Sequence, residues 1–450
     1  MENKKKKLFI YALDCATPQL IFDKYRNELP FISKIMKEGS FGLLRSTDPA
    51  ITIPAWMSMF TGKDPGQLGF YGFTDRSDYS YENIHIVNSN DVICDTVWDI
   101  LSKNNLKSIV IGIPPTYPPK PLKGILIADF LTPDKSLPFT YPKNIQEEIN
   151  KIAGGDYIID VENFMIEDHK KLLRHIYDMT EKRFEVINAF IKNKEWDLFI
   201  AMEIGLDRLH HGFWRFCFQD HFMYKKGNEF EGCIRDYYKF IDKKLEETYS
   251  LFKDSAEFMI VSDHGAKGSQ GSFFLNDWLI RNGYLFLKDN SLKQDRLSLD
   301  NVDWKKTRVW SKGGYYGRMF FNIKGREPMG IVLNEEIPAL TKEIRQKLSF
   351  IKNDDLKEIK SDVLQPREIY KEINNIPPDL LFYCGNLDWR ISDAVGKENL
   401  FSKEDNFGAD NANHDFNGIV VNSWKSKKKD LNICEIAPIV LDFFKLKNNE

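Results

Sequence analysis

Short apolar runs alternate with longer amphipathic stretches through roughly the first 280 residues. Because strands that are separated by helices need crossover connections, this alternation predicts an α/β fold. The expected architecture is a three-layer αβα sandwich with a largely parallel central sheet. The apolar runs predict strands at Leu8–Leu13, Phe41–Leu44, Ser108–Ile111, Ile125–Asp129, Leu198–Met202 and Phe258–Val261. The amphipathic stretches predict helices at Leu20–Lys37, Pro54–Phe60, Asp95–Lys103, Ile145–Ile152, Lys170–Ile191, Asp207–Phe218, Asp236–Phe252 and Leu275–Arg281.

The pattern changes between about 285 and 405, where Lys, Asp and Asn become more frequent. This segment carries extended runs at Gly317–Ile323 and Leu380–Tyr383 and one amphipathic helix near Leu340–Ile351. Beyond it, the alternation of strand and helix resumes, with a strand at Gly418–Asn422 and a final helix at Ile436–Phe444. We therefore expect one core domain, formed by residues 1–284 and 406–450, and an inserted lid subdomain at 285–405.

Composition narrows the class of protein. The chain has 450 residues with 42% hydrophobic residues, which is enough for a large core and excludes a disordered chain. The net charge of −3 gives no overall electrostatic footprint for nucleic acid. Six cysteines without CxxC spacing argue against a disulfide framework and a cysteine-based zinc site. We find no apolar run long enough to span a membrane and no signal peptide, and we expect a cytoplasmic protein.

Polar residues that could bind a ligand or take part in catalysis follow the predicted strands. Asp14 comes directly after the first strand, at the sheet edge where α/β proteins bind ligands, although it fits a helix N-cap equally well. Thr52 lies just before a short helix that Pro54 would begin and Gly62 would end. The positive end of that helix would stabilise an alkoxide or a phosphate there. A simple capping threonine is the alternative.

Histidines and carboxylates form the remaining clusters. Asp207 and His211 are four residues apart on one helical face, whereas His210 points about a quarter-turn away. Asp263 and His264 end a buried strand, and His414 precedes a late strand. Carboxylate, hydroxyl and imidazole ligands without a thiolate are typical of catalytic zinc, manganese or iron sites, and their number is enough for two metal ions. Since Thr52 has no adjacent base, metal coordination is the available means of activating its hydroxyl.

The order of these motifs resembles the alkaline phosphatase superfamily, in its type I phosphodiesterase/nucleotide pyrophosphatase branch. Leu13-Asp14-Cys15-Ala-Thr resembles the family's Leu-Asp-Gly-Ala-Thr, with Cys15 in place of Gly. Ile51-Thr52-Ile-Pro-Ala-Trp and the following Thr-Gly match the nucleophile motif. The segments around Asp207, around Asp263-His264 and around Asn413-His414 match the metal motifs. The resemblance covers nearly the whole chain.

The resemblance implies a metal-dependent phosphodiesterase with a catalytic threonine. It implies that Asp207, His211 and His414 hold one divalent ion and that Asp14, Asp263 and His264 hold another together with Thr52, which would form a covalent phospho-threonine. Zinc is the expected metal, with manganese as the alternative. The expected partner is a small phosphate ester or a nucleotide-type substrate. Family members that cleave nucleotides carry an Asn shortly after the nucleophile helix, and Gly69–Phe73 contains none.

Other functions share much of this pattern. A phosphomonoesterase, a phosphonate hydrolase or a phosphoryl transferase would use the same two-metal core. A sulfatase would need a Cys-x-Pro-x-Arg motif, which is absent, and a non-catalytic scaffold would be expected to have lost some of the seven ligand positions. Four further residues lie in segments that can approach the cleft and are candidates for substrate contact, although we favour solvated loop positions for each: Lys267, Lys312, Tyr315 and Tyr316.

Overall fold

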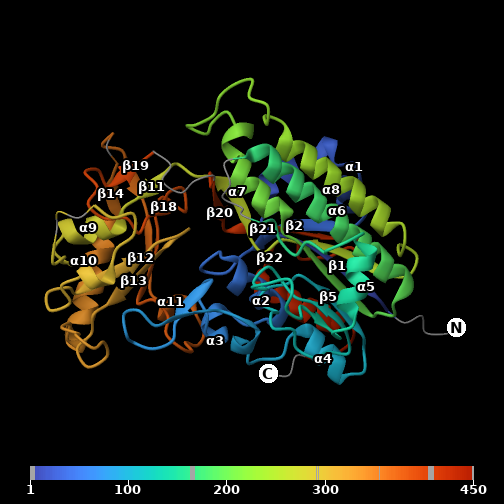
Figure 1. Ribbon diagram of the computed structural model, residues 1–450, viewed down its shortest axis with the longest axis horizontal. Coiled ribbons are helices and arrows are strands. Elements are labelled where there is room, and N and C mark those ends of the chain that lie inside the picture. Colours follow the sequence, from blue (N-terminus) through green and yellow to red (C-terminus); the bar gives the residue numbers. More distant parts are fainter. Residues whose placement is uncertain are drawn as a thin grey trace.

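A nine-stranded sheet forms the centre of the computed structural model (Figure 1), which describes residues 6–447 except 163–167, 290, 292, 354 and 404–409. The strand order is β22-β2-β21-β9-β1-β8-β5-β6-β7, and only β21 and β7 run antiparallel to the others. The predicted, largely parallel sheet is therefore confirmed. The bounds are β1 (Leu8–Leu13), β2 (Ser40–Arg45), β5 (Ser108–Ile111), β6 (Gly124–Ile127), β7 (Thr140–Tyr141), β8 (Leu198–Glu203), β9 (Glu257–Val261), β21 (Asn417–Asn422) and β22 (Leu431–Asn432).

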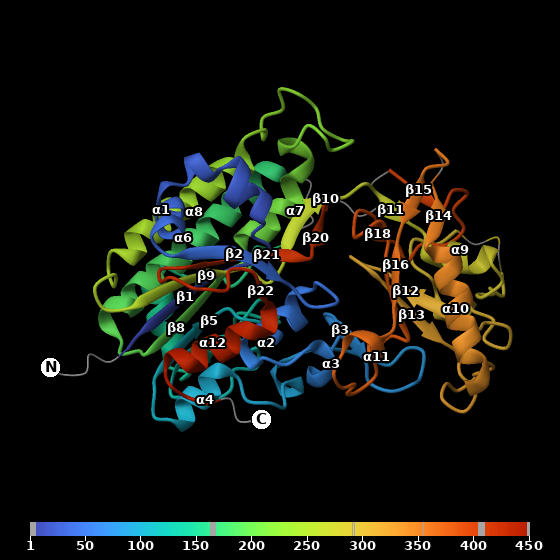
Figure 2. The same ribbon diagram turned by 180° about the vertical axis from the view of Figure 1, so that it is seen from behind.

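Helices cover both faces of this sheet (Figure 2). One face carries α1 (Pro30–Glu38), α6 (His169–Asn193), α7 (Gly205–Cys217) and α8 (Cys233–Tyr249), and the other carries α2 (Thr52–Thr61), α4 (Val97–Lys103) and α12 (Ile436–Phe443). Since both faces are covered, central strands such as β1 and β8 are buried along their whole length and read as continuous apolar runs. The chain is thus the predicted three-layer sandwich.

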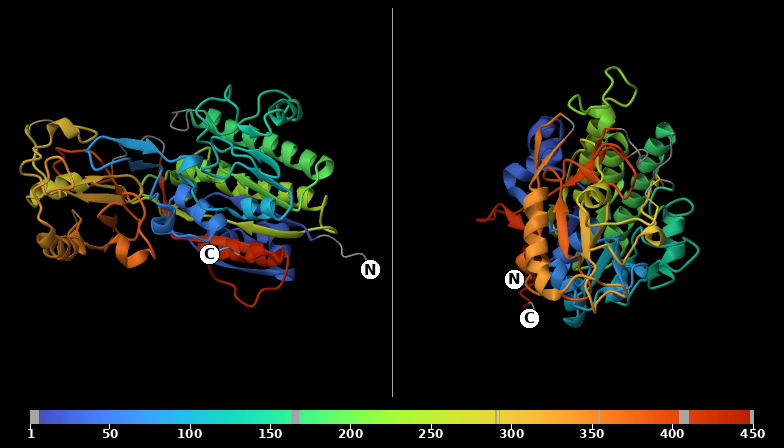
Figure 3. Two further views of the ribbon diagram at one scale, coloured as in Figure 1. Left: turned by 90° about the horizontal axis from the view of Figure 1, so that it is seen from below. Right: turned by 90° about the vertical axis from the view of Figure 1, so that its left-hand side faces the viewer.

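A second body of structure lies beside the main sheet (Figure 3) and has its own apolar cluster, whose members come from Phe273 to Phe401. Its largest sheet has the order β12-β13-β17-β16. Its elements are β11 (Ser272–Phe273), α9 (Leu275–Arg281), β12 (Val309–Lys312), β13 (Gly317–Phe321), α10 (Ile337–Leu348), β14 (Phe350–Lys352), β15 (Glu358–Lys360), β16 (Asp362–Leu364), α11 (Pro366–Ile369), β17 (Leu380–Tyr383), β18 (Arg390–Ile391) and β19 (Phe401–Ser402). The expected boundary between 405 and 406 lies outside the described residues.

A short antiparallel ladder ties the late part of the chain to the end of β9. It pairs β10 (Gly265–Gly268) with β20 (Ala412–Asp415) and sets Ala266 opposite His414. The remaining elements are α3 (Pro65–Leu68), β3 (Thr74–Arg76), β4 (Ile84–Ile86) and α5 (Ile145–Ile152). No helix in the described ranges is both long and apolar enough to cross a membrane.

Several predicted helix bounds differ from the structure, and proline explains two of the differences. The single helix predicted over Leu20–Lys37 is wrong, because a π-helical segment at Gln19–Lys24 and a short 3-10 turn precede α1, which begins at Pro30. Proline has no N–H and disfavours the helical conformation of the residue before it. Helix α2 begins at Thr52, two residues earlier than predicted. Backbone N–H groups in the first turn of a helix make no hydrogen bond within the helix, so Pro54, which has no N–H, fits inside the first turn and does not have to begin it. Gly62 ends α2 as predicted, with a φ of 73°.

Candidate metal centre

The carboxyl ends of three adjacent strands bring together three buried carboxylates. Strand β1 lies between β8 and β9 in parallel register, so the residues that follow these strands meet at one edge of the sheet. Asp14 directly follows β1, Asp207 lies in the first turn of α7 just after β8, and Asp263 is the second residue after the end of β9. Asp14 and Asp263 are fully buried, and Asp207 is 5% exposed. Charges at this depth need compensation.

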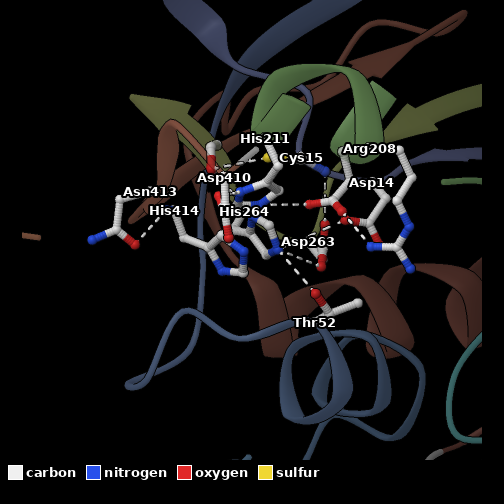
Figure 4. Close-up of polar contacts among 12 residues, drawn as sticks. Asp14, Cys15, Thr52, Arg208, His211, Asp263, His264, Asp410, Asn413 and His414 are labelled. Carbon is white, nitrogen blue, oxygen red and sulfur yellow. Dashed lines mark hydrogen bonds and ion pairs between the residues drawn. The ribbon is translucent and has the colours of Figure 1, made fainter. Parts of the chain in front are cut away.

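Three histidines lie beside these carboxylates (Figure 4). His264 follows Asp263 in the chain, and His211 lies one helical turn after Asp207 in α7, where the two side chains are 3.1 Å apart. His414 comes from β20, and the β10–β20 ladder stacks its ring on that of His264 with centroids 3.7 Å apart. All six predicted carboxylate and imidazole ligands therefore lie in one buried cluster.

Each of these histidines has one ring nitrogen in contact with an outer acceptor. The Nδ1 atoms lie 2.7 Å from Asp410 Oδ1 for His211, 3.1 Å from the Gly265 carbonyl for His264 and 2.7 Å from the Ala50 carbonyl for His414. A partner on Nδ1 fixes the ring orientation and leaves Nε2 as the nitrogen for a metal ion, which is how metal-binding histidines are usually held.

Thr52, which comes from helix α2, faces the same cluster. It is the first residue of α2 and is 4% exposed, and its Oγ1 atom lies 3.2 Å from His264 Nε2. The first turn of a helix carries a partial positive charge that stabilises anionic oxygen. Trp56, one turn further along α2, donates its indole N–H to Asp14 Oδ2 at 2.9 Å. Helix α2 thus positions both Thr52 and one of the carboxylates.

The ligand atoms form three groups that could each hold a metal ion. Within each group the atoms lie within 4.8 Å of one another, and the groups are Asp14, Asp263 and His264; Asp207, His264 and His414; and Cys15, Asp207 and His211. Asp14 Oδ1 and Asp263 Oδ2 are buried and accept no hydrogen bond from the described residues. Buried carboxylate oxygens in this state fit a divalent cation, which supplies the missing compensation.

The electrostatics of the cluster are uneven. Burial raises the pKa of Asp14 and of Asp263 well above the ordinary value. Burial alone would also raise the pKa of Asp207, but the neighbouring His211 and Arg208 outweigh it and lower that pKa below the ordinary value. Arg208 donates a hydrogen bond to Asp207 at 2.9 Å. Burial lowers the pKa of His264 to about 4, which keeps its imidazole neutral and able to bind a metal ion near pH 7.

Sequence patterns miss several residues that support this cluster. Asp410 contacts His211 and accepts from Arg390 at 2.5 Å, and Cys15 brings a thiol into the site. The interpretation of Tyr315 as a solvated loop residue is wrong, because its ring stacks on His414 with centroids 4.0 Å apart. Two signals are available in the sequence: Asp410 lies four positions before His414, and Cys15 directly follows Asp14 where the family motif has Gly, whereas Tyr315 depends on a distant contact.

Other expected surface positions are also corrected. Tyr316 is buried, and its hydroxyl donates to the Tyr71 carbonyl at 2.7 Å. Lys267 pairs with Asp388 at 3.0 Å rather than extending freely into solvent. His210 lies apart from the three groups and contacts the Tyr238 hydroxyl at 3.4 Å, in keeping with its different direction on the helix.

Comparison with known families decides the class of protein. The model of the type I phosphodiesterase/nucleotide pyrophosphatase family matches residues 8–414. The chain belongs to this family. As a member it is a phosphoric ester hydrolase of the phosphodiesterase/pyrophosphatase type, within the alkaline phosphatase superfamily. Among curated protein sequences, none matches this chain.

Solved structures share the family fold at low sequence identity. Human ectonucleotide pyrophosphatase/phosphodiesterase 5 matches with a TM-score of 0.56 and 12% identity, over 98% of this chain and 96% of that one. Phosphonoacetate hydrolase from Sinorhizobium meliloti 1021, in complex with phosphonoformate, matches with a TM-score of 0.61 and the same identity and coverage. An inactive murine ectonucleotide pyrophosphatase/phosphodiesterase 5, in which a threonine is replaced by alanine, is in complex with AMP; it has a TM-score of 0.56 and 12% identity over 99% and 96% of the chains.

Proposed function

We propose that this family member is a metal-dependent phosphodiesterase that uses Thr52 as its nucleophile on a small phosphate ester or nucleotide-type substrate. One observation carries the proposal. Thr52 lies at the start of α2, and its hydroxyl faces a buried cluster in which one oxygen of each of two carboxylates, Asp14 Oδ1 and Asp263 Oδ2, accepts no hydrogen bond from the described residues. A hydroxyl, a helix start and cation-binding oxygens are the parts that phosphoryl transfer needs.

The proposed ligands divide between two divalent ions, with zinc as the expected metal and manganese as the alternative. Asp14, Asp263, His264 and Thr52 would hold one ion. Asp207, His211 and His414 would hold the other. Such ions lower the pKa of a coordinated hydroxyl and stabilise the charge that develops on phosphoryl oxygens.

The reaction then follows from the position of Thr52. The Oγ1 proton passes to solvent and Oγ1 attacks phosphorus. The bond from phosphorus to the leaving oxygen breaks as the new bond forms, and the leaving oxygen takes a proton from solvent. The resulting phosphothreonine lies at the start of α2, where the helix end favours the anionic group. A water molecule then attacks phosphorus, the bond to Oγ1 breaks, and Thr52 regains its proton.

The known structures are consistent with this choice. The murine relative in complex with AMP is an inactive form in which a threonine is replaced by alanine. The phosphonoacetate hydrolase binds phosphonoformate on the same fold, so a phosphonate is the natural competing substrate class to test.

Hydrolysis of a bis-aryl phosphate, a mono-aryl phosphate and phosphonoacetate by the zinc- and manganese-loaded protein tests the proposal. We expect the diester to be cleaved fastest, and a chelator to abolish the activity until metal is restored. Thr52→Ala should lower kcat by at least about 1,000-fold, because loss of a nucleophile removes the main route. Thr52→Ser keeps a hydroxyl and is the matched control. Equal or faster monoester turnover would overturn the diesterase assignment, and full activity of Thr52→Ala would remove the nucleophile.

A further inference from the structure

Cys15 has a backbone conformation that side-chain-bearing residues rarely adopt. Its φ is 65°, in the left-handed region where glycine is favoured, and glycine is the residue found here in the family motif that this sequence resembles. The conformation has a clear structural use, because it directs the Cys15 N–H to Asp263 Oδ1 at 3.2 Å. Glycine would make the same hydrogen bond without strain. The presence of a cysteine at this position therefore needs a reason that lies in its side chain.

The side chain lies inside the metal cluster. The Cys15 sulfur, a carboxylate oxygen of Asp207 and a ring nitrogen of His211 are within 4.8 Å of one another. Cys15 is fully buried, and its Sγ atom lies 3.5 Å from the Gly265 carbonyl oxygen. The thiol lies close beside His211 (Figure 4). Each of the other five cysteines lies in a described part of the chain, and none joins a group of this kind.

We propose that Cys15 is a thiolate ligand of the metal ion held by Asp207 and His211, an inference that rests on the proposed metal centre. On binding, the S–H bond breaks, a sulfur–metal bond forms and the proton passes to solvent. Sulfur is a soft ligand that favours zinc, cobalt and cadmium over magnesium and manganese. Cys15 therefore biases this centre towards soft metals, in contrast to the oxygen and nitrogen ligands that the sequence motifs indicate.

The position of Cys15 also links the two proposed ions. Its amide holds Asp263, which belongs to the group with Asp14 and His264, while its sulfur lies with Asp207 and His211. One residue thus contacts both halves of the site, through the backbone on one side and the side chain on the other. A role in packing alone would make no use of the sulfur, and alanine or serine would serve it equally.

X-ray absorption at the zinc edge of the zinc-loaded full-length protein tests the proposal, with the metal content measured by mass spectrometry. Wild type should show a sulfur neighbour at about 2.3 Å from zinc. Cys15→Gly, which keeps the amide and suits the backbone, and Cys15→Ser should lose this neighbour. Cys384→Ala removes another fully buried thiol, in the second apolar cluster, and is the matched control that should retain it. Cadmium affinity of Cys15→Gly should fall by at least about 10-fold.

The outcomes separate this proposal from the metal centre itself. If zinc binds to wild type and no sulfur neighbour is seen, Cys15 is not a ligand, while the proposed centre stands. If the sulfur neighbour persists in Cys15→Gly, another cysteine provides it, and the proposal is again overturned. If the protein binds no zinc at all, the metal centre fails and Cys15 fails with it.

Discussion

Asp410 offers a direct test of how the proposed metal cluster is supported. Its Oδ1 atom lies 2.7 Å from His211 Nδ1, and its Oδ2 atom accepts from Arg390 at 2.5 Å. The carboxylate is 2% exposed and fixes the ring whose other nitrogen faces Asp207. Replacing Asp410 by Asn keeps the shape of the side chain and removes its charge. We expect the ring to stay in place but to bind metal more weakly.

The size of the effect follows from the type of hydrogen bond. A hydrogen bond to a charged group contributes about 1.5–3 kcal/mol, whereas a neutral one contributes about 0.5–1.5 kcal/mol. The difference of about 1–1.5 kcal/mol corresponds to roughly a 5- to 12-fold loss of metal affinity. Asp410→Ala removes the whole interaction, and its loss should reach roughly 10- to 150-fold. The order of the two variants is therefore part of the prediction.

Competition with a chromophoric zinc chelator measures the affinity, and thermal unfolding of the metal-free protein shows whether each variant folds. Asp379→Asn is the matched control, because Asp379 also pairs with an arginine, Arg326, at 2.7 Å but lies away from the cluster. It should leave the metal affinity unchanged. If Asp410→Asn binds zinc as tightly as wild type, or if Asp379→Asn weakens binding equally, the reasoning about Asp410 is refuted.

Three further changes have definite expected results. Arg183→Met should lower the free energy of unfolding in urea by about 3–5 kcal/mol, because it leaves buried Glu203 without its ion-pair partner at 3.3 Å, and adding Glu203→Gln should restore much of the loss. Burial lowers the pKa of Lys312 to about 8, so the unfolded chain binds more protons than the folded protein between about pH 8 and 10.4, and the free energy of unfolding should rise with pH in this range. Lys312→Met should remove this pH dependence. After allowance for the partial exposure of the side chain, the variant should be more stable than wild type by about 1–2 kcal/mol at pH 7. Trp56→Phe removes the indole hydrogen bond to Asp14 and shortens a fully buried side chain. Chelator competition should show roughly 5-fold weaker zinc binding, and the unfolding temperature should fall because of the cavity.

The sequence is informative where function depends on a strand end. Asp14 and Asp263 follow strands whose apolar runs are unmistakable, and the parallel arrangement of β1 and β9 brings these strand ends together. The pairing of Asp207 with His211 follows from helical spacing alone. Local sequence patterns are sufficient to predict these residues, because the only further information needed is that their strands are neighbours in the sheet.

The missed residues depend on contacts between distant segments. Tyr315 reaches His414 across 99 positions of sequence, and no local pattern marks an aromatic ring for such a contact. Cys15 lacks the spacing that identifies cysteine ligands, since its proposed companions are Asp207 and His211. The predicted start of α2 is misplaced because Pro54 occupies a permitted position inside the first turn rather than its beginning.

These distant contacts change how the segment predicted as an insertion relates to the candidate metal centre. Tyr315 and Arg390 both lie within 285–405, and they contact the site through His414 and Asp410 respectively. The Arg390 guanidinium also lies over the Tyr315 ring, 4.9 Å from its centroid, so the two contacts support each other. A freely moving lid would break both contacts on opening and leave the carboxylate of Asp410 without the cation that balances it. The cost of separating the buried Arg390–Asp410 pair therefore opposes a detachment of this segment from the site.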